Sequence, residues 1–249
     1  MYRMECTRLE LFRPNAYAAE LTVIRFACIL PPGYRVIRSV PAKGCRQMIS
    51  IYQLKPRFQS LLRPFVARLD RIGITANAVT LFAMFVSCAL GIVLIASGSP
   101  RLFLLLPLWM FLRMAFNAVD GMLAREFGHK SPLGAYLNEL TDVVSDAALY
   151  LPFVFVAPFG WGSIAAVIFL SALSEMTGAL GPMVGAERRY DGPMGKSDRA
   201  FVFGALGLWL GIAGRLPGWA YWIMPVVALL ILFNIVNRIR SALRQLAGN

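Results

Sequence analysis

Long apolar segments alternate with short polar connections between residues 76 and 240. Each segment approaches the ~20 apolar residues that a helix needs to cross the hydrocarbon core of a bilayer. We identify six of them, and the fifth is the shortest: residues 76–97, 102–119, 134–158, 161–184, 200–214 and 219–236. The pattern therefore predicts an all-α integral membrane bundle of six transmembrane helices.

A shorter segment with a different pattern precedes the first apolar one. Between residues 51 and 72, apolar side chains return at helical spacing, and lysine and arginine are interleaved with them. A helix with one apolar and one basic face lies in the interface between lipid headgroups and water. Residues 48–75 are therefore predicted to form an amphipathic juxtamembrane segment, and a solvated basic linker is the alternative.

Residues 1–47 continue neither pattern. They show no sustained period, and Pro31, Pro32 and Pro41 interrupt them. They also contain no apolar core long enough for a signal peptide. We expect either a disordered leader or a start site placed too far upstream, with Met48 as the alternative start. On this interpretation residues 76–240 form the membrane domain and residues 241–249 a cytoplasmic tail.

Composition supports the membrane interpretation, and the distribution of charge gives it an orientation. Hydrophobic residues make up 58% of the 249 residues and charged residues 15%, with a mean hydropathy of +0.62, which exceeds what a soluble domain needs. The net charge is +12. In the six-span layout the outer connections hold only Arg101 and Arg215, so the positive-inside rule places both chain ends in the cytoplasm. We therefore expect a bacterial inner membrane protein that contacts membrane lipid and binds no nucleic acid.

The 4 cysteines are scattered through the chain with no paired spacing. Structural zinc sites and disulfide frameworks both require cysteines at recurring short spacings. The sequence therefore indicates neither of these features.

Two polar stretches stand where the second apolar segment ends and the third begins. Asn117 and Asp120 are three residues apart, while Asn138, Asp142 and Asp146 follow one another at intervals of four. Residues at these spacings share one face of a helix. Because the connection between the two helices is short, they are expected to be antiparallel neighbours. The oxygen-rich faces would then meet in a pocket suited to a hard cation and a phosphate, and acidic residues inside membrane segments usually mark a site.

A second polar region, residues 187–199, connects the fourth and fifth apolar segments. Gly192 and Gly195 allow a turn that brings backbone close to a ligand, and Lys196 and Arg199 supply hydrogen-bond donors. The Gly-Lys-Ser triplet at 195–197 does not form a nucleotide-binding P-loop, because Tyr190 stands at the position of the first glycine and no βαβ unit surrounds it. The region is either a phosphate-binding loop or an ordinary basic cytoplasmic loop.

These polar residues resemble the signature of the CDP-alcohol phosphotransferases, D-x-x-D-G-x-x-A-R-x8-G-x-x-x-D-x-x-x-D. Six positions match it at the right spacings: Asp120, Gly121, Ala124, Arg125, Gly134 and Asp142. Asn117 and Asn138 stand where the family has its first and third aspartates. The resemblance extends from about Ile51 to the end of the chain. It is specific at the level of the family and does not identify the substrate.

The resemblance implies that an alcohol attacks the β-phosphoryl group of a CDP-linked donor, commonly CDP-diacylglycerol, and that CMP is released. Mg²⁺ or Mn²⁺ would be held by Asp120, with Asn117 and Asn138 as neutral ligands, and would stabilise the developing charge. Asp142 would be the base that takes the hydroxyl proton. The donor nucleotide and phosphate would be bound by Gly121, Ala124, Arg125 and Gly134.

Further roles follow from the same resemblance. Asp146, one turn beyond Asp142, is either an additional metal ligand or a structural polar residue. Several acceptors in the family carry a phosphate, for which Arg189, Lys196 and Arg199 are our candidates. Family analogy also implies a homodimer.

Two other functions stay open. Asparagine adds no charge to a metal site, so the chain could be a nucleotide- or lipid-binding homologue with weak or no turnover. A transporter could use the intramembrane aspartates as a proton or cation path. Transporters commonly contain internal repeats, and the sequence shows no convincing one.

Overall fold

The computed structural model describes residues 51–190 and 192–247, so the expectations for residues 1–47 lie outside the described residues. All regular elements in the described part are helices, which confirms the all-α fold class. The longer helices are α1 (Ile51–Arg71), α2 (Ala76–Ser97), α3 (Leu105–Glu126), α4 (Pro132–Tyr150), α5 (Trp161–Leu180), α6 (Lys196–Ala213) and α7 (Ile223–Ala247). Short 3₁₀ helices adjoin them: η1 (Pro100–Leu104), η2 (Leu151–Phe155), η3 (Gly181–Val184) and η4 (Gly218–Trp222).

Local chemistry explains where the helices of the site begin and end. The Thr75 hydroxyl caps α2 by accepting a hydrogen bond from the Ala78 N–H at 3.2 Å, and Gly98 ends this helix with a left-handed φ of 58°. The Ser131 hydroxyl caps α4 at 3.0 Å from the Gly134 nitrogen, and Pro132 occupies the first turn. The start of α4, which carries half of the polar signature, is therefore fixed by its own sequence.

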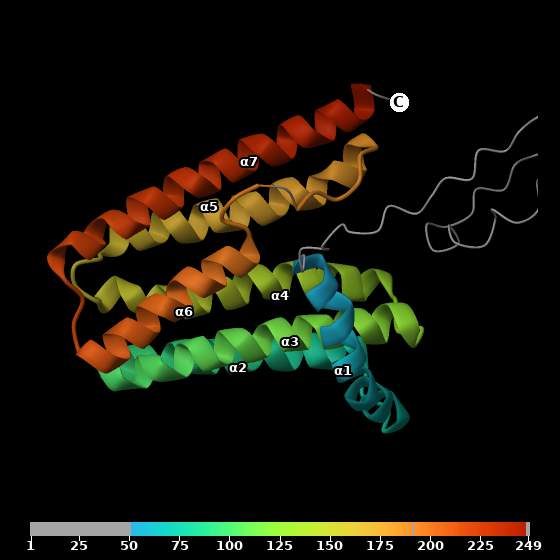
Figure 1. Ribbon diagram of the computed structural model, residues 1–249, viewed down its shortest axis with the longest axis horizontal. Coiled ribbons are helices and arrows are strands. Elements are labelled where there is room, and N and C mark those ends of the chain that lie inside the picture. The colour runs from blue at the N-terminus through green and yellow to red at the C-terminus, as the bar shows by residue number, and fades with distance from the viewer. Residues whose placement is uncertain (1–50, 191, 248–249) are drawn as a thin grey trace, which may run out of the picture. The chain divides into compact units, whose positions relative to one another are not determined.

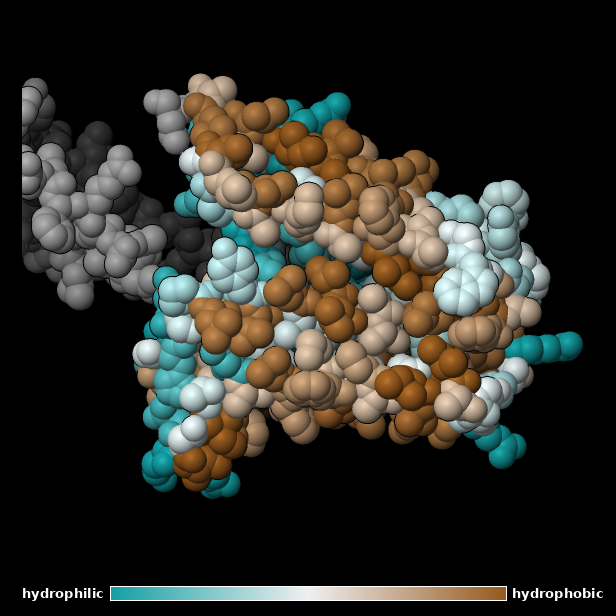
Figure 2. Space-filling view, turned by 180° about the vertical axis from the view of Figure 1, so that it is seen from behind, coloured by the Kyte–Doolittle hydropathy of each residue, from teal (hydrophilic) through white to brown (hydrophobic). Residues whose placement is uncertain are grey.

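Four helical stretches are long and apolar enough to cross a membrane: residues 76–97, 100–126, 161–184 and 218–247. Helices α4 and α6, which coincide with the third and fifth predicted spans, contain several charged residues and do not join this group. Six spans therefore stay a prediction. The second and last stretches extend beyond the predicted ends, and residues 241–247 belong to the last turns of α7, while their place in the cytoplasm stays a prediction. Figure 2 shows a largely apolar face, as a membrane protein requires.

Helix α4 has the central position in the bundle (Figure 1). It contacts α2 on one side and α5 on the other, while α5 also pairs with α7. Helix α3 contacts both α2 and α6. Polar residues on α3, α4, α5 and α6 can therefore meet inside the bundle although they are far apart in the sequence.

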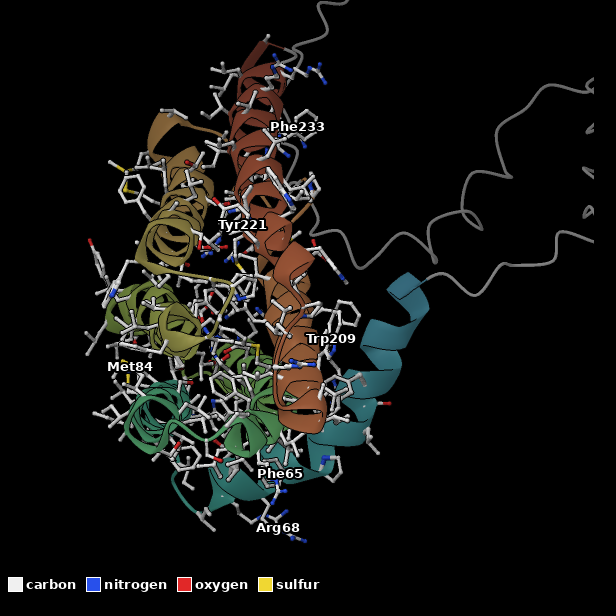
Figure 3. All side chains as sticks on the ribbon, turned by 90° about the vertical axis from the view of Figure 1, so that its left-hand side faces the viewer. Phe65, Arg68, Met84, Trp209, Tyr221 and Phe233 are labelled. Carbon is white, nitrogen blue, oxygen red and sulfur yellow. The ribbon has the colours of Figure 1, made fainter. Side chains whose placement is uncertain are left out.

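The main apolar core lies beside this meeting point. The Tyr150 ring on α4 stacks on the Phe203 ring of α6, with centroids 3.8 Å apart. Phe153 contacts Phe203 edge-on at 5.3 Å. On the outside of the bundle, large apolar side chains such as Trp209 and Phe233 are exposed (Figure 3). Apolar residues are thus found both in the core and on the outer face, the distribution expected for a bundle surrounded by lipid.

The amphipathic segment is confirmed as a helix, α1, and it packs against α3. Val66 is fully buried in an apolar cluster with Leu123. The Asp70 carboxylate lies 2.9 Å from His129 Nε2, in the connection between α3 and α4. The position of α1 at a membrane interface stays a prediction.

A close approach between α2 and α4 leads to the first testable prediction. A Cβ atom at Gly91 would overlap the backbone carbonyl of Ala148. We expect Gly91→Ala to lower the free energy of unfolding by ~1–3 kcal/mol, because the helices must move apart. Thermal unfolding in detergent measures the change. Gly162→Ala on α5 is the matched control, since a Cβ there meets open space; equal effects of the two substitutions would contradict the prediction.

Candidate active site

Asp120 lies near the end of α3 with its carboxylate turned into the bundle. The residue is 6% exposed, and its Oδ2 accepts a hydrogen bond from the Thr80 hydroxyl of α2 at 2.9 Å. None of the described residues forms an ion pair with Asp120. Asn117, one turn earlier on α3, is half-buried. Asp120 therefore provides a carboxylate on α3 that forms no ion pair with a described lysine or arginine.

Asp142 lies on α4 and has two cationic neighbours. Its Oδ1 forms an ion pair with the Lys196 ammonium, from the first turn of α6. The same oxygen lies 3.4 Å from Arg113 Nη2, which also donates to the Asp142 backbone carbonyl at 3.0 Å. The Asp142 side chain keeps 17% of its surface exposed. The predicted base is thus held between α3 and α6 and still has an open side.

Asp146 is held more completely than Asp142. One of its oxygens forms an ion pair with Arg113 Nη1, and the other lies 3.1 Å from Arg199 Nη2. The side chains of all three residues are almost fully buried. With a guanidinium on each oxygen, Asp146 connects α3, α4 and α6. These contacts favour the structural role that the sequence left open for it over metal ligation.

The ion-pair network continues through Glu175 on α5. Glu175 Oε1 accepts a hydrogen bond from Arg199 Nη2 at 2.9 Å, and its Oε2 lies 3.7 Å from Arg238 Nη1 on α7. Arg188, in the connection after η3, donates to Glu139 at 2.8 Å. Burial, reinforced by the charge of Arg238, lowers the pKa of the Arg188 guanidinium below its ordinary value. The network thus joins the site on α3 and α4 to the α5–α7 pair.

The three candidates for an acceptor phosphate are not all in one place. Lys196 and Arg199, both on α6, meet Asp142 and Asp146. Arg189 instead donates to the Ser241 carbonyl at 3.0 Å and to Gln245 at 2.8 Å, both on α7. The structure therefore brings two of the candidates to the aspartates and places the third against α7.

The two signature glycines make room for specific neighbours. A Cβ at Gly121 would lie 2.7 Å from Arg125 Nη2, so the Arg125 guanidinium folds back over the Gly121 backbone. A Cβ at Gly134 would lie 2.7 Å from the Asn77 side-chain oxygen, at the start of α2. Gly121 thus leaves room for the Arg125 guanidinium against its backbone, while Gly134 permits the close approach of α2 to α4.

Sequence reasoning missed three residues of the network: Arg113, Glu175 and Arg238. Arg113 contacts both Asp142 and Asp146. Each of the three lies inside or next to a segment predicted to span the membrane. A charge in such a segment is costly unless it is paired. The presence of a charged residue in or beside an apolar segment could therefore have identified these three residues, although not their partners.

The oxygen ligands in this chain match a smaller metal site than the full family signature implies. Among residues 51–190 and 192–247, no three histidine, cysteine, aspartate or glutamate side chains gather where they could hold a metal ion. Asp120 forms no ion pair among these residues, whereas Asp142 forms two. The Asn117 and Asn138 amides are neutral oxygen ligands, and affinity for Mg²⁺ depends strongly on carboxylates. Asp120, with the neutral oxygens of Asn117 and Asn138, is therefore the part of the signature that could hold a divalent cation.

Apolar helices around a buried polar site define this chain as a membrane protein with a charged centre in its helical bundle. The family model of CDP-alcohol phosphatidyltransferases matches residues 73–234. The chain belongs to this family, in which a substituted phosphoryl group passes from a CDP-alcohol to an acceptor and which depends on divalent metal. The resemblance inferred from the signature is confirmed.

Two relatives illustrate how far the sequence similarity extends. The inner membrane protein YnbA of Escherichia coli K12 is 44% identical over 195 residues, which cover 78% of this chain and 97% of that protein. The phosphatidylinositol phosphate synthase of Mycobacteroides abscessus is 33% identical over 112 residues, 45% of this chain and 49% of the synthase. The match to YnbA thus includes nearly the whole relative, whereas the match to the synthase includes about half.

Solved structures share the fold. The Mycobacterium tuberculosis phosphatidylinositol phosphate synthase PgsA1 with CDP-DAG bound aligns with a TM-score of 0.59 at 20% identity, covering 72% of this chain and 92% of that one. Its complex with manganese and citrate aligns with a TM-score of 0.57 at 21% identity, covering 72% and 87%. At such identities the likeness establishes the helical architecture and not the substrate.

Proposed function

We propose that this protein transfers a substituted phosphoryl group from a CDP-linked donor, with CDP-diacylglycerol as the first choice, to an alcohol and releases CMP. The observation that carries the proposal is the pair of carboxylates in the spacing of the family signature, Asp120 on α3 and Asp142 on α4, which lie close enough for the charge of one to act on the other. The CDP-DAG bound in the mycobacterial synthase structure supports the choice of donor. The bacterial inner membrane, with the site open to the cytoplasm, is the proposed location.

Asp142 is the proposed base. The alcohol oxygen attacks the β-phosphorus of the donor, and a new phosphorus–oxygen bond forms. The bond from this phosphorus to the bridging oxygen breaks, and its electron pair leaves with CMP. The hydroxyl proton passes to the Asp142 carboxylate, whose open side makes it reachable from the pocket. Lys196 and Arg113 hold this carboxylate in place during the transfer.

The donor site is proposed to consist of Gly121, Ala124, Arg125 and Gly134. Arg125 is exposed and its guanidinium lies over Gly121, where a phosphate oxygen could accept from it. Gly134 acts indirectly in this scheme, because it sets the distance between α4 and the start of α2.

A divalent cation, Mg²⁺ or Mn²⁺, would be held by Asp120 with Asn117 and Asn138, and would neutralise charge on the donor diphosphate. Asp146 is left out of this ligand set, because both of its oxygens already contact guanidinium groups. The manganese in a solved relative supports the class of metal.

For the acceptor we propose a small alcohol that carries a phosphate. Lys196 is 23% exposed beside Asp142 and can donate to such a phosphate, whereas Arg199 is fully buried and acts by holding the start of α6. Arg189 would contribute from the α7 side of the same loop. Family analogy supports a homodimer, which is part of the proposal.

The experiment that tests the proposal measures CMP release from CDP-diacylglycerol by the purified full-length protein, with phosphorylated and unphosphorylated alcohols added one at a time. Release that requires an alcohol supports the transferase. Donor binding without release under any condition would favour the binding homologue. Cation flux in proteoliposomes without CMP release would favour the transporter.

Replacing Asn117 by aspartate tests the metal role of this position. We expect Asn117→Asp to shift the saturation of activity to lower Mg²⁺ or Mn²⁺ concentration, because an added carboxylate attracts the cation more strongly. Metal titration of CMP release measures the shift. The maximal rate can change in either direction, since the new charge also repels the donor diphosphate. An unchanged metal requirement would show that Asn117 is not a ligand.

A further inference from the structure

The charges around Asp142 differ from those around Asp120. Asp142 Oδ1 has an ammonium in contact and a guanidinium nitrogen at 3.4 Å, while Asp120 accepts a hydrogen bond from the neutral hydroxyl of Thr80 and forms no ion pair among the described residues. The signature position one turn before Asp142 is occupied by the uncharged Asn138. A second divalent ion near α4 would therefore find two side chains: the Asp142 carboxylate, which already has two cationic neighbours, and the neutral Asn138 amide.

We propose that the Lys196 ammonium is a built-in cation that takes the place of a second divalent ion in the active site, so that each chain binds a single divalent ion at Asp120. An ammonium is a compact positive charge with three hydrogen-bond donors, and it needs no carboxylate cage. It can therefore hold Asp142 and also bind an oxygen of a substrate phosphate. This inference rests on the proposed function and specifies how its site balances charge.

The contacts around Lys196 hold its backbone in place. A side-chain cation that replaces a metal ion needs such a fixed position. Lys196 begins α6, and one turn later the fully buried Arg199 bonds to Asp146, Glu175 and the Met194 carbonyl. The connection before α6 is also held, because the Asn234 amide donates to the Pro193 carbonyl at 2.8 Å. The ammonium is thus presented from an anchored helix start rather than from a free loop.

Counting bound Mn²⁺ by electron paramagnetic resonance tests the inference independently of turnover. The purified full-length chain should bind one Mn²⁺ at saturation, and Asn138→Asp should still bind one. Combining Asn138→Asp with Lys196→Met should raise the count to two, because the new carboxylate at position 138 and Asp142, no longer paired with the ammonium, then lie one turn apart on α4.

Two controls separate charge from disturbance of the fold. Asn138→Asp combined with Lys196→Arg keeps a cation at position 196 and should bind one Mn²⁺. Asn138→Asp combined with Lys130→Met removes an exposed lysine outside the site and should also bind one. Size-exclusion chromatography identifies the folded fraction that is counted.

Several outcomes would overturn the inference. The inference is overturned if the wild type binds two Mn²⁺ ions or none. It is also overturned if the folded variant that combines Asn138→Asp with Lys196→Met binds one ion, or if either control binds two. The CMP assay reports separately on the proposed function. A wild type that turns over with two bound ions overturns this inference alone, while an inactive wild type with one bound ion overturns the proposed function and not the metal count.

Discussion

Replacing Arg199 by leucine is expected to lower the free energy of unfolding by ~3–5 kcal/mol and to abolish activity. The guanidinium is fully buried and joins Asp146 on α4 to Glu175 on α5. Without it, both acidic groups lose a partner inside the bundle, and the removal of one member of a buried ion pair has an effect of this size. A whole domain is stable by only ~5–15 kcal/mol, so the loss is large.

Thermal unfolding in detergent, together with the yield of folded protein, measures this effect. Arg215→Leu is the matched control, because Arg215 is exposed in the connection after α6 and should change the free energy of unfolding by less than ~0.5 kcal/mol. Arg199→Lys keeps the charge but has no second nitrogen to donate to the Met194 carbonyl, so it should fall between the two. Equal stability of the leucine variant and the wild type would show that the network does not hold α6 in place.

Replacing Asp142 by asparagine is expected to reduce the rate of CMP release by ~10²–10⁴-fold, the usual effect of removing a general base. The amide can still contact Lys196, so the fold and the binding of the CDP-linked donor should change little. We therefore expect this variant to lose rate while its affinity for the donor stays near that of the wild type, whereas a disturbed site would lose both.

The measurement compares the maximal rate of CMP release with the donor affinity at saturating metal. Asp70→Asn is the matched control, since Asp70 lies on α1 and contacts His129 outside the site; its rate should stay near that of the wild type. Near-normal turnover of the Asp142 variant would remove Asp142 from the role of base. A parallel loss of rate and affinity would mean that its carboxylate binds the donor.

The sequence alone determined the helical class, the membrane environment and the family. Apolar segments of sufficient length have few alternatives in a bilayer, because every backbone polar group must be bonded within the helix. The signature around Asp120 and Asp142 depends on spacing within single helices, which local geometry fixes. These properties follow from short-range order, so they could be predicted before the helices were placed together.

Other features of the site depend on how the helices pack, and the sequence could not supply them. Arg113 is 33 residues from Asp146, Arg199 is 53, and Glu175 is 24 from Arg199. A buried charge must have a partner, but helical periodicity does not say which helix provides it. Only the packing of α3, α4, α5 and α6 shows that Asp146 is held by two arginines and that Lys196 reaches Asp142. The sequence determined which residues are charged, and the tertiary structure decided which of those charges neutralise one another, because electrostatic pairing depends on distance in space.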